Sequence, residues 1–290
     1  MAPTIVFIGG GNMCEAILSG LLKIGHPTAN VRVSEPFPER AQYLREKYSI
    51  DVFESNDDAI TGSAGKISTS PADVVVLAVK PQVVAGVVKG ASAALLAAQP
   101  LVISIVAGVA IADFKRWIHS SGDSSAHVPL VRLMPNTPAL VGEGAAGMFA
   151  NEDVSAAQKE QTEYVVKNIA KEYFWVASES GIDAVCAVSG SGPAYFFLVI
   201  EAMEKAGQDL GLPADVAKRL AAQTALGAAK MVLTSEDDVA TLRRKVTSPN
   251  GTTHAGIEKM KEERVPEGVD QGMKACFARC SSLSEEFGKL

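Results

Sequence analysis

The sequence has little of what marks a disulfide scaffold, a nucleic-acid-binding protein or a membrane protein. Only 4 of its 290 residues are cysteines, too few and too scattered for a disulfide framework. The net charge is −6 with no block of Lys or Arg, which argues against nucleic-acid and anionic-membrane partners because both require concentrated positive charge. The longest apolar runs, near 74–79 and 101–112, are shorter than the ~20 residues of a membrane span. The N-terminus has no basic region of a secretory signal, so we expect a soluble, cytoplasmic protein.

The cysteines and histidines also lack the close spacing in sequence that is typical of metal ligands. Cys276 and Cys280 are four residues apart in a helical pattern, with no His or further Cys close in sequence to complete a site. We therefore expect no metal site, and reduced cysteines near the packing face of a helix. The remaining composition is that of an ordinary globular protein, with 47% hydrophobic and 21% charged residues.

The first half of the chain alternates short apolar or β-branched runs with helical patterns. Within the expected strand 73–79, residues 74–79 are continuously apolar, which is typical of a strand buried on both faces. This alternation predicts βαβ units and a mostly parallel sheet. The expected strands are 4–8, 31–34, 51–54, 73–79, 101–107 and 128–133, followed by edge strands 147–150 and 173–177 with a helix over 153–171 between them.

After about residue 177 the pattern is helical and contains no convincing strand. Pro213, Pro249 and Pro266 punctuate this half, each at a position suited to a break or a first helical turn. The sequence therefore predicts an α/β domain over 1–177 and an all-α domain over 178–290. The expected helices are 182–188, 193–210, 213–233, 237–246, 252–261 and 269–287.

A glycine-rich turn joins the first expected strand to the first helix. Gly9, Gly10 and Gly11 stand where a dinucleotide-binding fingerprint requires glycine, so that the backbone can approach a pyrophosphate at the helix N-terminus. Cys14 occupies the third position of the fingerprint, where Gly or Ala is usual, and is still small enough for close helix–strand packing. We expect a Rossmann-type nucleotide-binding domain.

Glu35 follows the second strand, where the adenosine ribose is expected. A carboxylate there accepts hydrogen bonds from both ribose hydroxyls, which suits NADH, and repels the 2′-phosphate of NADPH. Arg40, one helical turn on, could offset that repulsion, as could Arg32 if its side chain points toward the phosphate. The alternative is that Glu35 is only an exposed charge at a strand end.

Three further segments follow strands of the expected sheet. Ala78–Pro81, Ile105–Gly108 and Met134–Pro138 each begin where a strand ends. Because the carboxyl ends of strands line the ligand crevice of an open α/β sheet, we expect all three to face the same crevice.

Two motifs lie in the helical half. The segment 247–253, Thr-Ser-Pro-Asn-Gly-Thr-Thr, collects backbone N–H groups and hydroxyls at one helix N-terminus, an anion site of a size for a carboxylate, or an ordinary capped helix start. The segment 189–195, Ser-Gly-Ser-Gly-Pro-Ala-Tyr, permits a tight chain path and on its own could be a helix–helix junction.

Taken together, these segments resemble the pyrroline-5-carboxylate reductase family nearly end to end. The resemblance implies a Rossmann-type N-terminal domain and a helical C-terminal domain through which subunits form homodimers, with higher assemblies such as decamers. It also implies reduction of (S)-1-pyrroline-5-carboxylate to L-proline by NADPH or NADH. The motifs that carry it are Gly-x-Gly-Asn-Met at 9–13, Ala-Val-Lys-Pro at 78–81, Met-Pro-Asn-Thr-Pro at 134–138, Ser-Gly-Ser-Gly-Pro-Ala-Tyr at 189–195 and Ser-Pro-Asn-Gly-Thr-Thr at 248–253.

The resemblance also assigns residues. In NADPH-using members Ser or Thr commonly stands at the position of Glu35, so this chain slightly favours NADH. The Thr253 hydroxyl would bond the ring nitrogen of the substrate and is the expected catalytic group. The expected cofactor-binding residues are Ile8, Gly9, Gly10, Gly11, Asn12, Met13, Glu35, Asn56, Ala78, Val79, Lys80, Pro81, Ile105, Val106, Ala107 and Lys245. The expected substrate-binding residues are Glu179, Ser248, Asn250, Gly251, Thr252 and Thr253.

Two other functions remain open from the residues. A dehydrogenase of the hydroxyacid type would use a lysine base in a helix of the second domain, for which Lys230 is the one candidate. A non-catalytic nucleotide sensor would need no substrate loop, and a test for imine-dependent NAD(P)H oxidation separates it from an enzyme.

Overall fold

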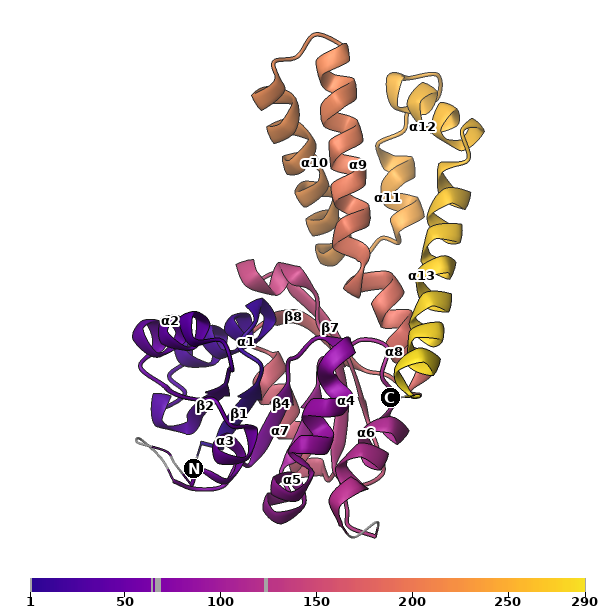
Figure 1. The fold of residues 1–290 in the computed structure, drawn as a ribbon. Helices are drawn as coiled ribbons and strands as arrows, with labels where there is room; N and C mark the ends of the chain where they lie inside the picture. The colour runs from indigo at the N-terminus through magenta and orange to yellow at the C-terminus, as the bar shows by residue number, and fades with distance from the viewer. Residues whose placement is uncertain (1, 64, 66–68, 123–124, 290) are drawn as a thin grey trace. The chain divides into compact units, whose positions relative to one another are not determined.

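The computed structural model describes residues 2–63, 65, 69–122 and 125–289 (Figure 1). The chain divides into two compact units, one formed by Met1–Gly190 with Cys276–Leu290 and the other by Ser191–Ala275. Residues 178–190 and 276–290 therefore group with the sheet rather than with the helices that separate them in sequence.

The first unit is built on one sheet of eight strands in the order β3-β2-β1-β4-β5-β6-β7-β8. From β3 to β6 all neighbours are parallel, β7 is antiparallel to β6, and β8 is parallel to β7. The order 3-2-1-4-5-6 is that of a dinucleotide-binding Rossmann sheet, so the expected mostly parallel α/β fold is confirmed. The strands are β1 (Ile5–Ile8), β2 (Val31–Ser34), β3 (Asp51–Phe53), β4 (Val74–Leu77), β5 (Leu101–Ser104), β6 (Leu130–Met134), β7 (Gly144–Ala150) and β8 (Ala170–Trp175).

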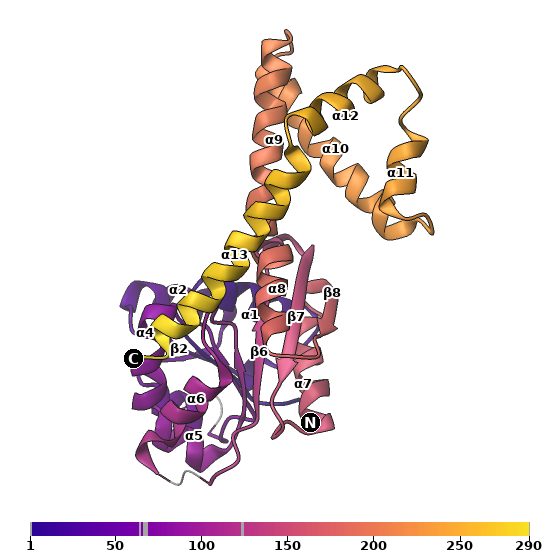
Figure 2. The same cartoon turned by 90° about the vertical axis from the view of Figure 1, so that its right-hand side faces the viewer.

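Apolar residues on alternate positions of the central strands contribute to two hydrophobic cores, one on each face of the sheet. In β1, Ile5 and Phe7 belong to one core and Val6 and Ile8 to the other. Figure 2 shows α4, α5 and α6 on one side of the sheet and α7 on the other. The first core is covered by α1 (Asn12–Lys23), α2 (Pro38–Tyr48) and α7 (Ala156–Val166), and the second by α3 (Asn56–Thr61), α4 (Pro81–Gly90), α5 (Ser92–Ala98) and α6 (Ile111–Ile118).

Cys14 is fully buried in the first core, which confirms that its side chain fits between α1 and the sheet. Short 3₁₀ turns complete the connections at Thr28–Asn30, His119–Ser121 and Thr137–Val141.

The expected helix over 153–171 is shorter in the structure. Ser155 caps α7 through the backbone N–H of Gln158, and Ser155 and Gln158 together form a capping box. At the other end, Ala170 pairs with Gly144, so strand β8 begins where the sequence pattern still predicted helix. Pairing with β7 therefore decides the end of this helix, because a sheet partner overrides a weak local preference.

The end of the first unit and the whole second unit are helical. After α8 (Ser180–Val185) and a π-helical segment (Cys186–Gly190) come α9 (Gly192–Asp209), α10 (Ala214–Thr234), α11 (Val239–Lys245) and α12 (Thr252–Glu262). The last helix, α13 (Val265–Phe287), begins before the expected residue 269 because Pro266 lies in its first turn, where proline is tolerated.

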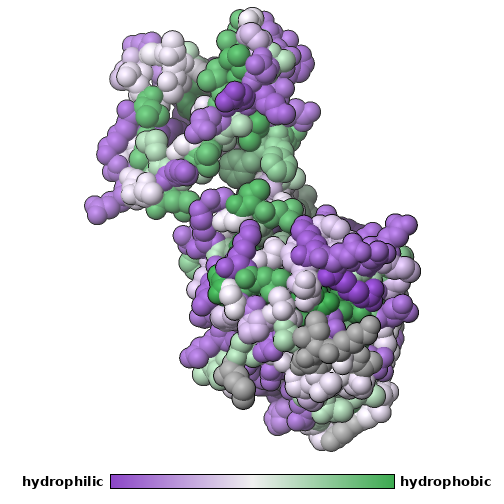
Figure 3. All heavy atoms as spheres, turned by 90° about the vertical axis from the view of Figure 1, so that its left-hand side faces the viewer, coloured by the Kyte–Doolittle hydropathy of each residue, from purple (hydrophilic) through white to green (hydrophobic). Residues whose placement is uncertain are grey.

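The second unit has almost no core of its own. In α9 and α10 the buried residues are Gly192, Ala217 and Ala221, all of them small. Phe196, Phe197, and many other large apolar side chains of these helices are exposed, and Figure 3 shows hydrophobic surface, in green, on the helical unit. Large exposed apolar patches are rare on monomeric proteins and are typical of interaction surfaces.

Candidate dinucleotide and substrate site

The glycine loop after β1 has a backbone path that only glycine tolerates. Gly9 has a φ of +99°, and a Cβ placed on it would lie 2.8 Å from the carbonyl oxygen of Ala78. Loop and neighbouring strand end are therefore in direct backbone contact at the carboxyl edge of the sheet.

The N-terminus of α1 suits a phosphate. Gly11 is its N-cap, and within the described part of the chain no side chain caps this helix. Gly11 is exposed, and among the described residues no heavy atom lies within 4 Å of the position that its Cβ would take. The first turn of a helix has backbone N–H groups without intrahelical partners and a positive dipole end, so this open position fits the pyrophosphate of a dinucleotide.

Glu35 is held in place by the same loop. One carboxylate oxygen accepts a hydrogen bond from the Gly10 N–H at 2.9 Å and the other from the Phe37 N–H at 3.0 Å. The residue is 6% exposed, so the alternative of an exposed strand-end charge is wrong. A carboxylate fixed beside the glycine loop lies where the ribose of a bound dinucleotide is expected.

Arg40 is already engaged at this site. Its Nε donates to the carbonyl oxygen of Gly10 and its Nη2 to Glu15, both at 2.6 Å. Partial burial works to raise the pKa of Glu15, but hydrogen bonds from Lys47, two tyrosines and Arg40 outweigh it and lower the pKa to about 2. Arg40 would therefore have to leave a charged partner in order to bind a 2′-phosphate.

The side chain of Arg32 points away from the carboxyl end of β2, where the ribose is expected. It is 1% exposed, and its Nη1 donates to the carbonyl oxygen of Ala59 in α3. Burial lowers its pKa. The side chain of Arg32 therefore does not point toward the expected ribose, and the condition under which it could offset the charge of a 2′-phosphate is not met, because its guanidinium is buried against α3.

The remaining cofactor-binding residues expected in this unit follow neighbouring strands. Asn56 begins α3 and accepts a hydrogen bond from the Ser34 hydroxyl at 2.6 Å. Lys80, exposed, is the N-cap of α4 and is followed by Pro81 at the first helical position. Ile105–Ala107 follow β5. Because β3, β2, β1, β4 and β5 are adjacent and parallel, these segments lie along one edge of the sheet.

Glu179 is bound to the sheet unit itself. Its Oε1 accepts hydrogen bonds from the Ile111 N–H at 2.7 Å and from Arg132 at 3.0 Å. Arg132 is buried and also lies 3.5 Å from Asp183. No local sequence signal points to Arg132 or Asp183, because Arg132 meets the two partly buried carboxylates only through the fold. The substrate-binding role expected for Glu179 stays a prediction.

The expected substrate loop belongs to the second unit. Asn250 has a φ of +57°, and its N–H donates to Nδ1 of His254 at 3.2 Å. Gly251 is the N-cap of α12, which no side chain caps within the described residues, and Thr252 and Thr253 are exposed in its first turn. Free N–H groups and two hydroxyls thus gather at one helix N-terminus, as the sequence predicts.

Two other candidates of the second unit have different surroundings. Lys245 ends α11 and forms an ion pair with Asp237, and its expected contact with a cofactor stays a prediction. Lys230, the base required by the hydroxyacid alternative, is exposed on α10.

An apolar cavity of about 470 Å³ lies elsewhere in the first unit, between β7, β8 and α8. Its wall includes Ala146, Phe174, Val185 and Val188. It includes none of the expected cofactor- or substrate-binding residues.

Comparison with protein families gives two matches along the chain. Residues 4–108 match the family described as NADP oxidoreductase, coenzyme F420-dependent, and residues 179–283 match the pyrroline-5-carboxylate reductase dimerisation family. Together with the sheet order and the glycine loop, the first match defines a Rossmann-type oxidoreductase that uses a nicotinamide cofactor.

Full-length relatives give the particular family. The chain is 44% identical over 287 residues to a pyrroline-5-carboxylate reductase of Pseudomonas aeruginosa and 40% identical to one of Pasteurella multocida, covering 99% of each chain in both cases. A solved pyrroline-5-carboxylate reductase of Coxiella burnetii superposes with a TM-score of 0.86 at 36% identity, over 98% of this chain and 99% of that one. A pyrroline carboxylate reductase of Plasmodium falciparum with NADP bound gives 0.82 at 26% identity, over 97% and 98%. The chain belongs to the pyrroline-5-carboxylate reductase family.

Proposed function

We propose that this protein reduces (S)-1-pyrroline-5-carboxylate to L-proline with NAD(P)H. The observation that carries the proposal is the first turn of α12, where Thr252, Thr253 and free backbone N–H groups form a site for a carboxylate beside a hydrogen-bonding hydroxyl. The family membership supplies the reaction. Residues 1–177 are the dinucleotide-binding part and residues 178–290 the dimerisation and substrate-binding part.

The cofactor is held by the carboxyl edge of the sheet. The loop Ile8–Met13 binds the pyrophosphate at the N-terminus of α1, and Glu35 and Asn56 flank the adenosine ribose. Ala78–Pro81 and Ile105–Ala107 flank the nicotinamide end, with Lys245 beside it. Once bound, NAD(P)H supplies the hydride for the reaction.

The chain's own task is to position the imine. The Ser248–Thr253 loop binds the substrate carboxylate, and the Thr253 hydroxyl hydrogen-bonds the ring nitrogen. Protonation of that nitrogen makes C5 electrophilic, and holding C5 in a fixed orientation converts an encounter into a nearly unimolecular step. Glu179 is the other residue to which we assign a substrate-binding role, near the carboxylate of the substrate. Neither a protein nucleophile nor a metal ion is needed for this chemistry.

The cofactor preference follows from Glu35. A carboxylate fixed by the Gly10 and Phe37 N–H groups stays close to the expected ribose, and Arg40 is held by Glu15. Both contacts favour the uncharged ribose diol of NADH over the 2′-phosphate of NADPH. We therefore propose that the enzyme prefers NADH while accepting both.

The helical half is proposed as the subunit interface of a homodimer or a higher homo-oligomer such as a decamer. The support is the match to the dimerisation family and the exposed apolar side chains of α9 and α10. The helical stretch Ser180–Asp209, which joins α8, the π-helical segment and α9, is long and apolar enough to cross a membrane by length and composition, with 22% of its apolar window buried. We assign that surface to a second copy of the chain in a cytoplasmic enzyme, with neither membrane nor nucleic acid as partner.

The proposed reaction is tested by NAD(P)H oxidation that depends on 1-pyrroline-5-carboxylate, measured with each cofactor and checked by detection of proline. Oxidation of a 2-hydroxy acid without imine reduction would instead support the hydroxyacid alternative. Cofactor binding with no turnover of either substrate would support a nucleotide sensor. Sedimentation at micromolar concentration tests the assembly, because an active monomer contradicts it.

The role of Thr253 is tested by two substitutions. Thr253→Ala should lower kcat/KM by roughly 10–100-fold, since one hydrogen bond to a charged or reacting group contributes about 1.5–3 kcal/mol. Thr253→Ser keeps the hydroxyl and should recover most of the activity, while the affinity for the cofactor stays unchanged in both variants. Wild-type activity in Thr253→Ala would remove this residue from the mechanism.

A further inference from the structure

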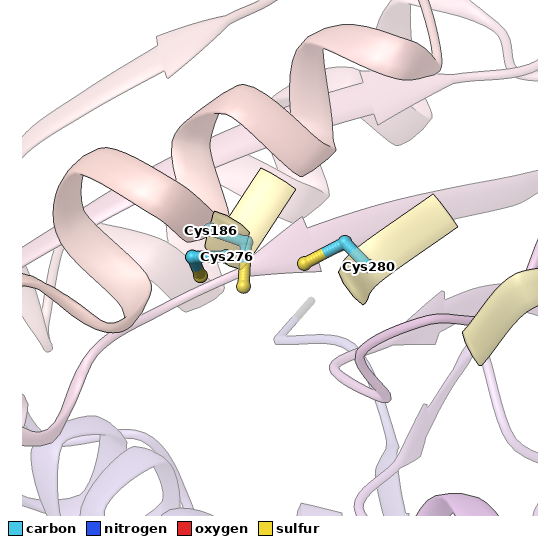
Figure 4. A group of neighbouring side chains, drawn as sticks. All are labelled: Cys186, Cys276 and Cys280. Carbon is cyan, nitrogen blue, oxygen red and sulfur yellow. The ribbon is translucent and has the colours of Figure 1, made fainter. Parts of the chain in front are cut away.

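Three of the four cysteines come together at one place in the first unit. The Sγ atoms of Cys186, Cys276 and Cys280 all lie within 4.8 Å of one another. Cys186 begins the π-helical segment after α8, whereas Cys276 and Cys280 share one face of α13 at i,i+4 spacing. In Figure 4 the sulfur of Cys280 points toward the other two.

The spacing of the sulfur atoms suits a shared metal ion better than a disulfide. A Zn–S bond of about 2.3 Å places two thiolates of one tetrahedral site about 3.8 Å apart. The three Sγ atoms lie within 4.8 Å of one another, so small changes in side-chain rotation bring them to that separation. A disulfide needs about 2.05 Å between two sulfurs, and it would leave the third cysteine of the cluster unused.

The burial of the three cysteines also fits a metal site that an ion can reach from solvent. Cys186 and Cys280 are buried, and Cys276 is partly exposed, so an ion can arrive past Cys276 and finish in an environment that excludes most water. Thiolates are the ligands that thiophilic d¹⁰ ions such as Zn²⁺ and Cu⁺ select over carboxylate-preferring ions such as Mg²⁺.

We propose that Cys186, Cys276 and Cys280 form a three-thiolate site for a thiophilic d¹⁰ metal ion. The ion replaces one proton on each thiol, so three protons are released for each ion bound, and no oxidation occurs. With Zn²⁺ the fourth coordination position is taken by water or by a ligand from solution.

The site would fasten the C-terminal part of α13 to the sheet unit. Leu283, one turn beyond Cys280, lies so close to Gly108 that a Cβ on that glycine would be 2.7 Å from the Leu283 Cβ. Gly108 directly follows the segment Ile105–Ala107 that we assign to the cofactor. Metal binding would therefore stabilise a helix that packs next to the cofactor-binding edge, and this inference does not depend on which substrate the enzyme reduces.

The test uses the full chain, reduced, stripped with a chelator and titrated with Zn²⁺ in competition with a chromophoric chelator. We expect about one ion per chain for the wild type and for Cys14→Ala, a matched control because Cys14 is buried in α1 outside the cluster. Cys276→Ser should lower the affinity for Zn²⁺ at least 10-fold. Even the loss of a residue that only hydrogen-bonds a metal ligand typically lowers metal affinity 10–100-fold. Zn²⁺ should also raise Tm in the wild type and not in Cys276→Ser.

Cys276 is the least buried of the three residues, so its substitution tests the site even if Cys186→Ser fails to fold. Co²⁺ as a second probe should give thiolate charge-transfer absorption that Cys276→Ser loses. Equal Zn²⁺ affinity in the wild type and Cys276→Ser would overturn the proposal. So would loss of binding in Cys14→Ala, or a thiol count on the native, metal-free protein showing that two of the clustered cysteines form a disulfide.

Discussion

Replacing Glu35 should change the choice between the two cofactors. Both carboxylate oxygens of Glu35 accept backbone N–H groups, from Gly10 and from Phe37, so the charge is fixed rather than free to swing away. Glu35→Gln removes the charge and keeps the shape, while Glu35→Ser also opens space for a phosphate. Both variants should shift the ratio of kcat/KM values toward NADPH.

The magnitude follows from Coulomb's law. A phosphate carrying about two negative charges, placed about 4 Å from one carboxylate in water, is destabilised by about 2 kcal/mol, and partial exclusion of water increases this figure. About 2 kcal/mol corresponds to about 30-fold in kcat/KM. Arg40 opposes the effect only by leaving Glu15, to which its Nη2 is hydrogen-bonded at 2.6 Å. We therefore expect a shift of about 10–30-fold once this rearrangement is counted.

The assay is steady-state kcat/KM for NADH and NADPH at fixed, low ionic strength, because salt screens the repulsion. Glu46→Gln is the matched control, since Glu46 is an exposed carboxylate of α2 that bonds Gln42, and it should leave the ratio unchanged. A wild type that already prefers NADPH, combined with an unchanged ratio in Glu35→Gln, would refute the placement of the ribose beside Glu35.

Two further predictions concern the glycine loop and acid stability. Gly11→Ala should still fold with only a small decrease in Tm, because the described residues leave its Cβ position open while alanine is a poorer helix N-cap than glycine. The variant should bind cofactor at least about 10-fold more weakly if the pyrophosphate lies there, as a titration followed by nicotinamide fluorescence would show. Unchanged affinity would contradict that placement. Gly9→Ala should lower Tm itself, because its φ is +99° and its Cβ would contact a backbone oxygen. Hydrogen bonds from Lys115 and His127 lower the pKa of Asp153 to about 2, below the ~3.9 of an unfolded Asp, so its contribution to stability is present above pH ~4 and is lost as the pH falls toward 2. Asp153→Asn should therefore lower Tm at pH 7 and have a progressively smaller effect below pH 4, whereas an effect independent of pH would contradict the ion pairs.

Much of the fold could be predicted from the sequence because its signals are local. Continuous apolar runs such as Val74–Leu77 predict strands buried on both faces, and the turn Gly9–Gly11 predicts a phosphate-binding helix start, since each signal depends on neighbours a few residues away. The same holds for the first turn of α12, where the order Asn-Gly-Thr-Thr sets the backbone path at residues 250–253.

Tertiary structure decided what depends on distant partners. Strand β8 begins at Ala170 because it pairs with β7, and periodicity alone extended the preceding helix into that strand. The sequence places Arg32 near a strand end, but only the packed sheet buries its guanidinium against α3. Cys186 lies far from Cys276 and Cys280 in sequence, and the three sulfurs meet only because the end of α13 returns to the sheet unit. Local patterns thus determined the elements and the motifs. Contacts between side chains that are many residues apart were decided by the fold, because local sequence patterns do not show which distant segments pack together.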